Sequence, residues 1–111
     1  MSVPHLHALE AALGRRGWRV VAAHPGDGDR TAATWEVERG HGERWLIDFD
    51  GLGPAGDTCL PLAASYGCQA RGRPAARLYF RRVRRSRELW LRELAAFVRG
   101  LDDAPPVTPG G

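Results

Sequence analysis

Apolar and polar residues alternate most clearly in two neighbouring segments, residues 34–39 and 43–50, which are joined by Gly40-His41-Gly42. Successive side chains of a strand point to opposite faces of a sheet, so a period of two indicates strands with one buried face. The short glycine-containing connection then predicts a β-hairpin. The residues expected to face the core are Trp35, Val37, Trp45, Ile47 and Phe49.

Helical spacing marks the two ends of the chain. Apolar residues recur every three or four positions over residues 4–16 and again from about Ser86 to Arg99, which predicts two amphipathic helices. Gly17 and Gly100 suit helix C-terminal ends, and Ser86 suits an N-cap. Residues 102–111 offer almost nothing apolar to bury, so we predict a single domain over residues 1–101 followed by a flexible tail.

The remaining segments complete an α+β fold. Residues 18–24 read as a strand, residues 60–65 as a short helix or turn, and residues 66–71 and 75–82 as a second hairpin. We expect a mostly antiparallel five-stranded sheet with the N- and C-terminal helices packed on one face, in the order α-β-β-β-turn-β-β-α. This order is similar to that of type III secretion effector chaperones, a resemblance of topology that no motif accompanies.

The amino-acid composition excludes several kinds of catalytic and binding site. The 111 residues are 43% hydrophobic and 26% charged, as expected of one globular domain. All 16 basic residues are arginine, and the absence of lysine excludes both a phosphate-binding loop with its lysine and Schiff-base catalysis. No zinc-site spacing occurs among the four histidines and two cysteines, and we expect no cofactor. We expect a cytoplasmic protein without a membrane span, with Cys59 and Cys68 as reduced thiols.

One string has the form of a catalytic motif. Residues 45–52, Trp-Leu-Ile-Asp-Phe-Asp-Gly-Leu, resemble the first motif of haloacid-dehalogenase-like phosphatases, an apolar strand that ends in Asp-x-Asp-Gly-Thr. The resemblance implies a Mg²⁺-dependent phosphohydrolase in which Asp48 is the nucleophile and Asp50 the general acid/base. Leu52 stands where that family has threonine, and the family's lysine has no counterpart here. The same string also fits a half-buried strand that enters an Asp-Gly turn.

The hairpin predicts a second candidate site on its polar face. Four carboxylates share that face if the tryptophans point inward, and oxygen ligands of this kind hold Mg²⁺ or Ca²⁺. The alternative is a solvated face on which the acids pair with arginines of neighbouring strands. The residues are Glu36, Glu38, Asp48 and Asp50.

Arginines are concentrated in the second half of the chain. The segment from Arg71 to Arg87 holds eight of them and no acid, and an aromatic residue stands among them. Guanidinium groups bind phosphates and an aromatic ring stacks on a base, so the segment is a candidate nucleic-acid surface, although a GC-rich coding bias also enriches arginine. The candidate residues are Arg71, Arg73, Arg77, Tyr79, Arg81, Arg82, Arg84 and Arg85.

Three functions therefore stay open. The first is a non-catalytic interaction module whose partner is a second copy of the chain or another protein, since an open sheet with exposed edges favours association. The second is nucleic-acid binding through the arginine-rich segment. The third is metal-dependent hydrolysis centred on Asp48 and Asp50.

Overall fold

The part of the chain that the structure describes forms one five-stranded sheet and two helices. The computed structural model describes residues 4–26, 30–40, 42–51, 60–72, 76–80 and 86–103. The elements in chain order are α1 (Pro4–Arg15), β1 (Arg19–Pro25), β2 (Thr31–Arg39), β3 (Glu43–Asp50), the 3₁₀ turn η1 (Leu62–Ala64), β4 (Gly67–Ala70), β5 (Arg77–Tyr79) and α2 (Arg87–Asp103).

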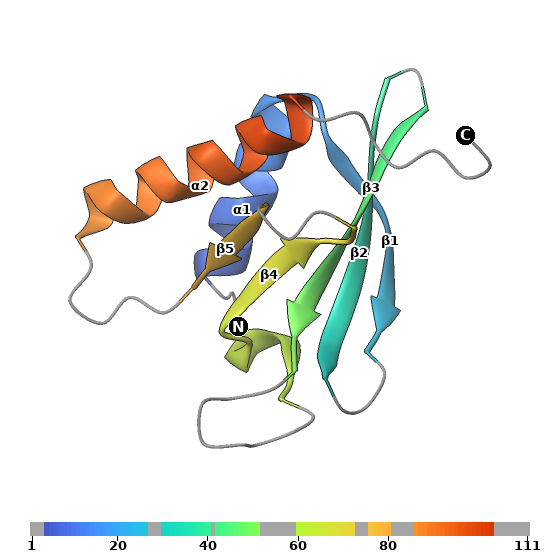
Figure 1. Cartoon of the computed structure of the whole chain (residues 1–111), viewed down its shortest axis with the longest axis vertical. Coiled ribbons are helices and arrows are strands. Elements are labelled where there is room, and N and C mark those ends of the chain that lie inside the picture. Colours follow the sequence, from blue (N-terminus) through green and yellow to red (C-terminus); the bar gives the residue numbers. More distant parts are fainter. Residues whose placement is uncertain are drawn as a thin grey trace.

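The sheet is a simple meander. Each strand pairs antiparallel with the next one in the chain, in the spatial order β1-β2-β3-β4-β5, so β1 and β5 are the edge strands. Both helices lie on the same side of this sheet (Figure 1). The structure thus confirms the α+β fold and the element order that the sequence predicts.

The core lies between the helices and one face of the sheet. The alternation in β2 and β3 sends large apolar side chains to this face, where Trp35 and Phe49 meet edge to face with ring centroids 4.7 Å apart. Helix α2 adds Trp90, which packs against Phe80. Burial of this apolar surface is the main force that holds the two layers together.

The turn after α1 places a tryptophan in the core. Gly17 adopts a left-handed backbone with φ +85°, and its N–H donates to the carbonyl of Gly14 at 3.1 Å. The N–H of Trp18 donates to the carbonyl of Leu13 at 2.9 Å, which completes a Schellman ending. Trp18 is consequently 1% exposed.

Helix α2 begins where the sequence predicts and ends later. The Oγ of Ser86 accepts a hydrogen bond from the Leu89 N–H at 3.1 Å, so Ser86 is the N-cap. The helix then continues through Gly100 to Asp103, whereas the sequence suggested an end near Arg99 and a tail from residue 102. Of that tail, residues 104–111 lie outside the described residues.

The extended end of α2 is fixed by one carboxylate. Asp102 accepts hydrogen bonds from the indole N–H of Trp18 at 2.9 Å and from Nε of Arg16 at 2.6 Å, and it also pairs with Arg39 of β2. These contacts outweigh the effect of burial, which raises the pKa of a carboxyl, so the pKa of Asp102 is lowered. Asp102 therefore links α2, β2 and the turn after α1.

Candidate functional site

The sheet face opposite the helices is the candidate site. Neither helix covers it (Figure 1). The pairing registers put Thr34 opposite Asp48 and Asp48 opposite Gln69, and these side chains lie on this open face because their neighbours in each strand point into the core. The four predicted carboxylates, Glu36, Glu38, Asp48 and Asp50, all belong to it.

Asp48 is the centre of one hydrogen-bonded group. Thr34 donates its hydroxyl to Oδ1 of Asp48 at 2.7 Å. Arg71 donates two hydrogen bonds to the same carboxylate, from Nη2 to Oδ1 at 2.7 Å and from Nε to Oδ2 at 2.9 Å. The hydrogen bond to Asp48 is also the main reason why the pKa of Arg71 is raised. Both oxygens of Asp48 are therefore engaged within the protein.

Asp50 belongs to a second group at the β5 end of the face. It pairs with Arg77, whose other guanidinium nitrogen donates to the side-chain oxygen of Gln69 at 3.0 Å. The same guanidinium lies over the ring of Tyr79, 4.9 Å from its centroid. Burial raises the pKa of the Asp50 carboxyl, and the charge and hydrogen bond of Arg77 offset this only in part.

Glu36 and Glu38 form the third group with Arg44. The two guanidinium ends of Arg44 donate to Glu36 at 2.6 Å and to Glu38 at 2.8 Å, and the hydrogen bond to Glu38 is the largest cause of the raised pKa of Arg44. His24 of β1 approaches Glu36 at 3.4 Å. This is the cross-strand pairing of acids with arginines that the sequence offered as the alternative to metal binding.

The structure does not bring the acids together as metal ligands. Within the described ranges, no group of three or more histidine, cysteine, aspartate or glutamate side chains has a geometry that could hold a metal ion. Each of the four carboxylates instead faces an arginine. The arrangement favours a polar surface of paired charges over a cation site.

The geometry also lacks the features of the phosphatase motif. That resemblance implies a strand of a parallel sheet, whereas β3 is antiparallel to both of its neighbours. Asp48, the implied nucleophile, has Thr34 and Arg71 on its two oxygens. Asp50, the implied acid/base, is paired with Arg77, and Leu52 lies outside the described residues.

Only part of the arginine-rich candidate surface is described. Arg71 and Arg77 lie on the open face and are both occupied by aspartates, while Tyr79 is 50% exposed. The other candidates lie outside the described residues; they are Arg73, Arg81, Arg82, Arg84 and Arg85. Of the eight candidate residues, the two arginines that can be placed are therefore each paired with an aspartate.

Cys68 is a core residue. It is a free thiol, fully buried on the helix-facing side of β4, and burial raises its pKa far above the ordinary value. A buried thiol that stays protonated is a poor nucleophile. Cys59 lies outside the described residues.

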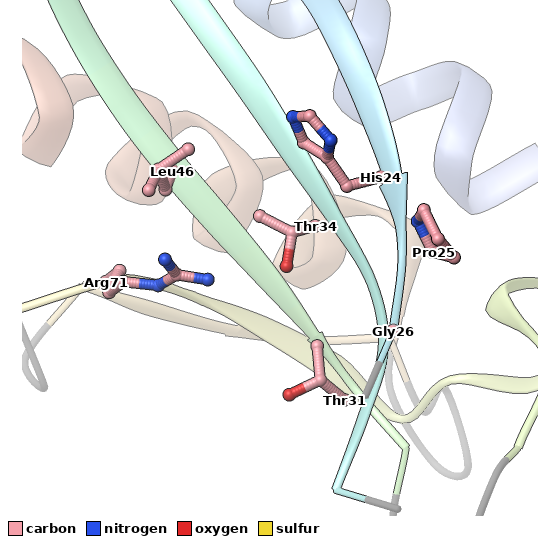
Figure 2. Close-up of a pocket in the computed structure, with 7 residues that line it drawn as sticks. All are labelled: His24, Pro25, Gly26, Thr31, Thr34, Leu46 and Arg71. Carbon is pink, nitrogen blue, oxygen red and sulfur yellow. The ribbon is translucent and has the colours of Figure 1, made fainter. Parts of the chain in front are cut away.

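A hollow of about 420 Å³ opens on the polar face between β1, β2 and β3. Figure 2 shows Leu46 and Thr34 on neighbouring strands with the Arg71 guanidinium beside them and the His24 ring on the β1 side. The remaining lining residues are Pro25, Gly26 and Thr31. The hollow places the apolar side chain of Leu46 beside polar groups that are bonded to Asp48, which suits a peptide-like ligand with both apolar and polar groups.

The sequence alone did not single out this hollow. The alternation in β2 and β3 does place Thr34 and Leu46 on the outer face, and that signal was available. The contributions of His24 from β1 and Arg71 from beyond β4 depend on pairing between distant segments. A local pattern carries no such information.

Two further findings bear on the class of protein. No helix in the described part of the chain has the length and apolar character needed to span a bilayer. Comparison with known proteins gives no match, whether with family models, with curated proteins or with solved structures.

Proposed function

We propose that this protein is a small non-catalytic module that binds a protein segment across the open face of its sheet. The observation that carries the proposal is the uncovered hollow around Leu46, set in a face whose four carboxylates are already paired with arginines. Carboxylates that are paired with arginines need no bound ion to stabilise them. The hydrogen bonds of the sheet hold the backbone of this face in place. We place it in the cytoplasm, where the free thiol of Cys68 would stay reduced.

The charge balance of the face favours a protein partner over a polyanion. Its four carboxylates are paired with the three guanidinium groups of Arg44, Arg71 and Arg77. Nucleic-acid binding needs cations that are available to phosphates. A peptide instead can pack an apolar side chain against Leu46 in the hollow.

The experiment compares the wild-type chain with Leu46→Glu as affinity baits. The added carboxylate would stand at the hollow, so we expect the retained partner to be lost while the melting temperature stays close to that of the wild type. Ala63→Glu, on the exposed η1 turn whose residues do not line the hollow, is the matched control and should keep the partner. Identical sets of retained proteins from both variants would contradict the proposal.

The same preparation tests nucleic-acid binding. A mobility shift of mixed oligonucleotides that weakens with salt, and that falls in the variant carrying Arg81→Glu and Arg84→Glu, would replace protein binding as the proposed function. We expect no such shift, since Arg71 and Arg77, the two candidate arginines that can be placed, are held by aspartates.

A further inference from the structure

A stripe of exposed residues runs along the outer side of α2. Glu88, Leu91, Ala95 and Arg99 are spaced three and four positions apart, so they lie on one side of the helix, and all four are exposed. Leu91 is 42% exposed, so it adds apolar surface on the side of the helix that faces away from the core. The outer side of the helix layer thus carries an acid at one end, apolar residues in the middle and a base at the other end.

A groove lies beside this stripe where α1 and α2 meet. It has a volume of about 260 Å³, its floor consists of Ala12, Ala95 and Val98, and arginines form its rim. Arg16 is held by Asp102, but Arg15 and Arg99 make no ion pair within the described ranges. The groove therefore combines a small apolar floor with two available guanidinium groups, which suits a carboxylate on an apolar neighbour.

The stripe is complementary to itself when two copies run antiparallel. The midpoint between Leu91 and Ala95 falls on Glu93, and the midpoint between Glu88 and Arg99 lies within one residue of it. One two-fold axis near Glu93 therefore places Leu91 against Ala95 of the second copy and Glu88 near its Arg99. Isologous dimers require this kind of self-complementary surface.

We propose that the exposed stripe of α2 is a homodimer interface, with Glu88 of each copy seated in the α1–α2 groove of the other between Arg15 and Arg99. The alanines at the crossing allow the two helices to approach closely, and Leu91 fills the space beside them. This inference goes beyond the proposed function, because the helix layer lies on the opposite side of the molecule from the open sheet face (Figure 1). The dimer interface on α2 and the binding site on the sheet face can therefore be refuted independently of each other.

The test follows the molar mass by light scattering over a range of protein concentrations. We expect the wild type to dimerise, and we expect Leu91→Glu and Arg99→Glu each to weaken association by about tenfold or more. Glu88→Arg should weaken it similarly, because like charges then meet across the interface. The matched control is Val21→Glu on the exposed edge strand β1, which should leave association unchanged.

The decisive variant combines Glu88→Arg with Arg99→Glu. It exchanges the charges in both copies, so it should restore the dimer that each single change weakens, even though both changes oppose the dipole of α2. Far-ultraviolet circular dichroism confirms that each variant is folded. A wild type that is monomeric at every concentration, dissociation by Val21→Glu but not by Leu91→Glu, or a double variant that stays monomeric would each overturn the proposal.

Discussion

Asp102 shows how one residue can hold three elements in place. Its carboxylate lies at the C-terminal end of α2, where a negative charge is unfavourable to the helix dipole. Arg16 and Arg39 supply the compensating charge, and Arg39 also lies over the ring of Trp18 at 4.5 Å. The carboxylate is thus stabilised by its tertiary partners and not by its own helix.

We predict that Asp102→Asn destabilises the fold by about 1–3 kcal/mol at neutral pH, because two guanidinium groups lose their charged acceptor. The difference should depend on pH. The pKa of Asp102 is lower in the folded chain than in the unfolded chain, so its contribution is complete above the unfolded value of about 3.9 and is lost as the pH falls through the folded value. Urea unfolding of wild type and variant over this acidic range measures the loss.

The matched control for Asp102 is Glu10→Gln, which alters an exposed carboxyl on α1. It should change the free energy of unfolding by less than about 0.5 kcal/mol. A difference between wild type and Asp102→Asn that stays constant down to low pH would show that the carboxylate charge does not contribute, and would reject the prediction.

At the scale of elements, two glycines have opposite roles. A Cβ on Gly67 of β4 would stand 2.5 Å from the carbonyl oxygen of Leu78, so the close pairing of β4 with β5 depends on its absence. Gly100 lies inside α2 and a Cβ there would meet nothing within 4 Å. One glycine is required by packing, and the other is a weak point of its helix.

Alanine substitutions should therefore act in opposite directions. We predict that Gly67→Ala lowers the free energy of unfolding by about 1–3 kcal/mol through overpacking. Gly100→Ala should raise it by about 0.5–1 kcal/mol, because alanine is the better helix former. Chemical denaturation of both variants beside the wild type measures the two changes. Equal effects of the same sign would show that local space does not decide the outcome.

Helices and strands could be predicted from the sequence where the signal lies within a few neighbouring residues. The observed β3 covers residues 43–50 as predicted, since Trp45, Ile47 and Phe49 alternate with residues of the opposite face that are polar except for Leu46. The end of α2 was placed too early, because Gly100 signals a stop in isolation and the contacts of Asp102 that extend the helix come from residues far away in the chain. Strands β4 and β5 are shorter than the predicted segments 66–71 and 75–82.

The sequence predicted which face of the hairpin carries the candidate site, but it did not predict how the side chains on that face pair. Alternation placed Glu36, Glu38, Asp48 and Asp50 on one side of the hairpin, where the structure has them. The partner of each acid depended on register: Arg71 reaches Asp48 and Arg77 reaches Asp50 only because β4 and β5 pair in one particular alignment. Sequence reasoning left pairing and metal binding open for this reason.

At the scale of the whole molecule, tryptophans connect the two layers. Trp45 of β3 donates its indole N–H to the carbonyl of Leu101 in α2 at 3.2 Å, and Trp18 is bonded to Asp102 in the same turn. Trp90 comes from α2 itself and is 3% exposed. Helix α2 therefore cannot leave the sheet without exposing indoles that belong to three parts of the chain.

Unfolding should consequently be a single cooperative transition in which the helices and the core are lost together. We predict that the shift of tryptophan emission to longer wavelength and the loss of the far-ultraviolet helical signal have the same midpoint in urea, because all four indoles are buried in one core. Trp90→Phe should lower that midpoint while the two signals stay coincident, since the remaining indoles still report on the layer contact. A helical signal that survives after the emission has shifted would show that α2 is stable without the sheet, contrary to an architecture in which packing of the amphipathic face stabilises the helix.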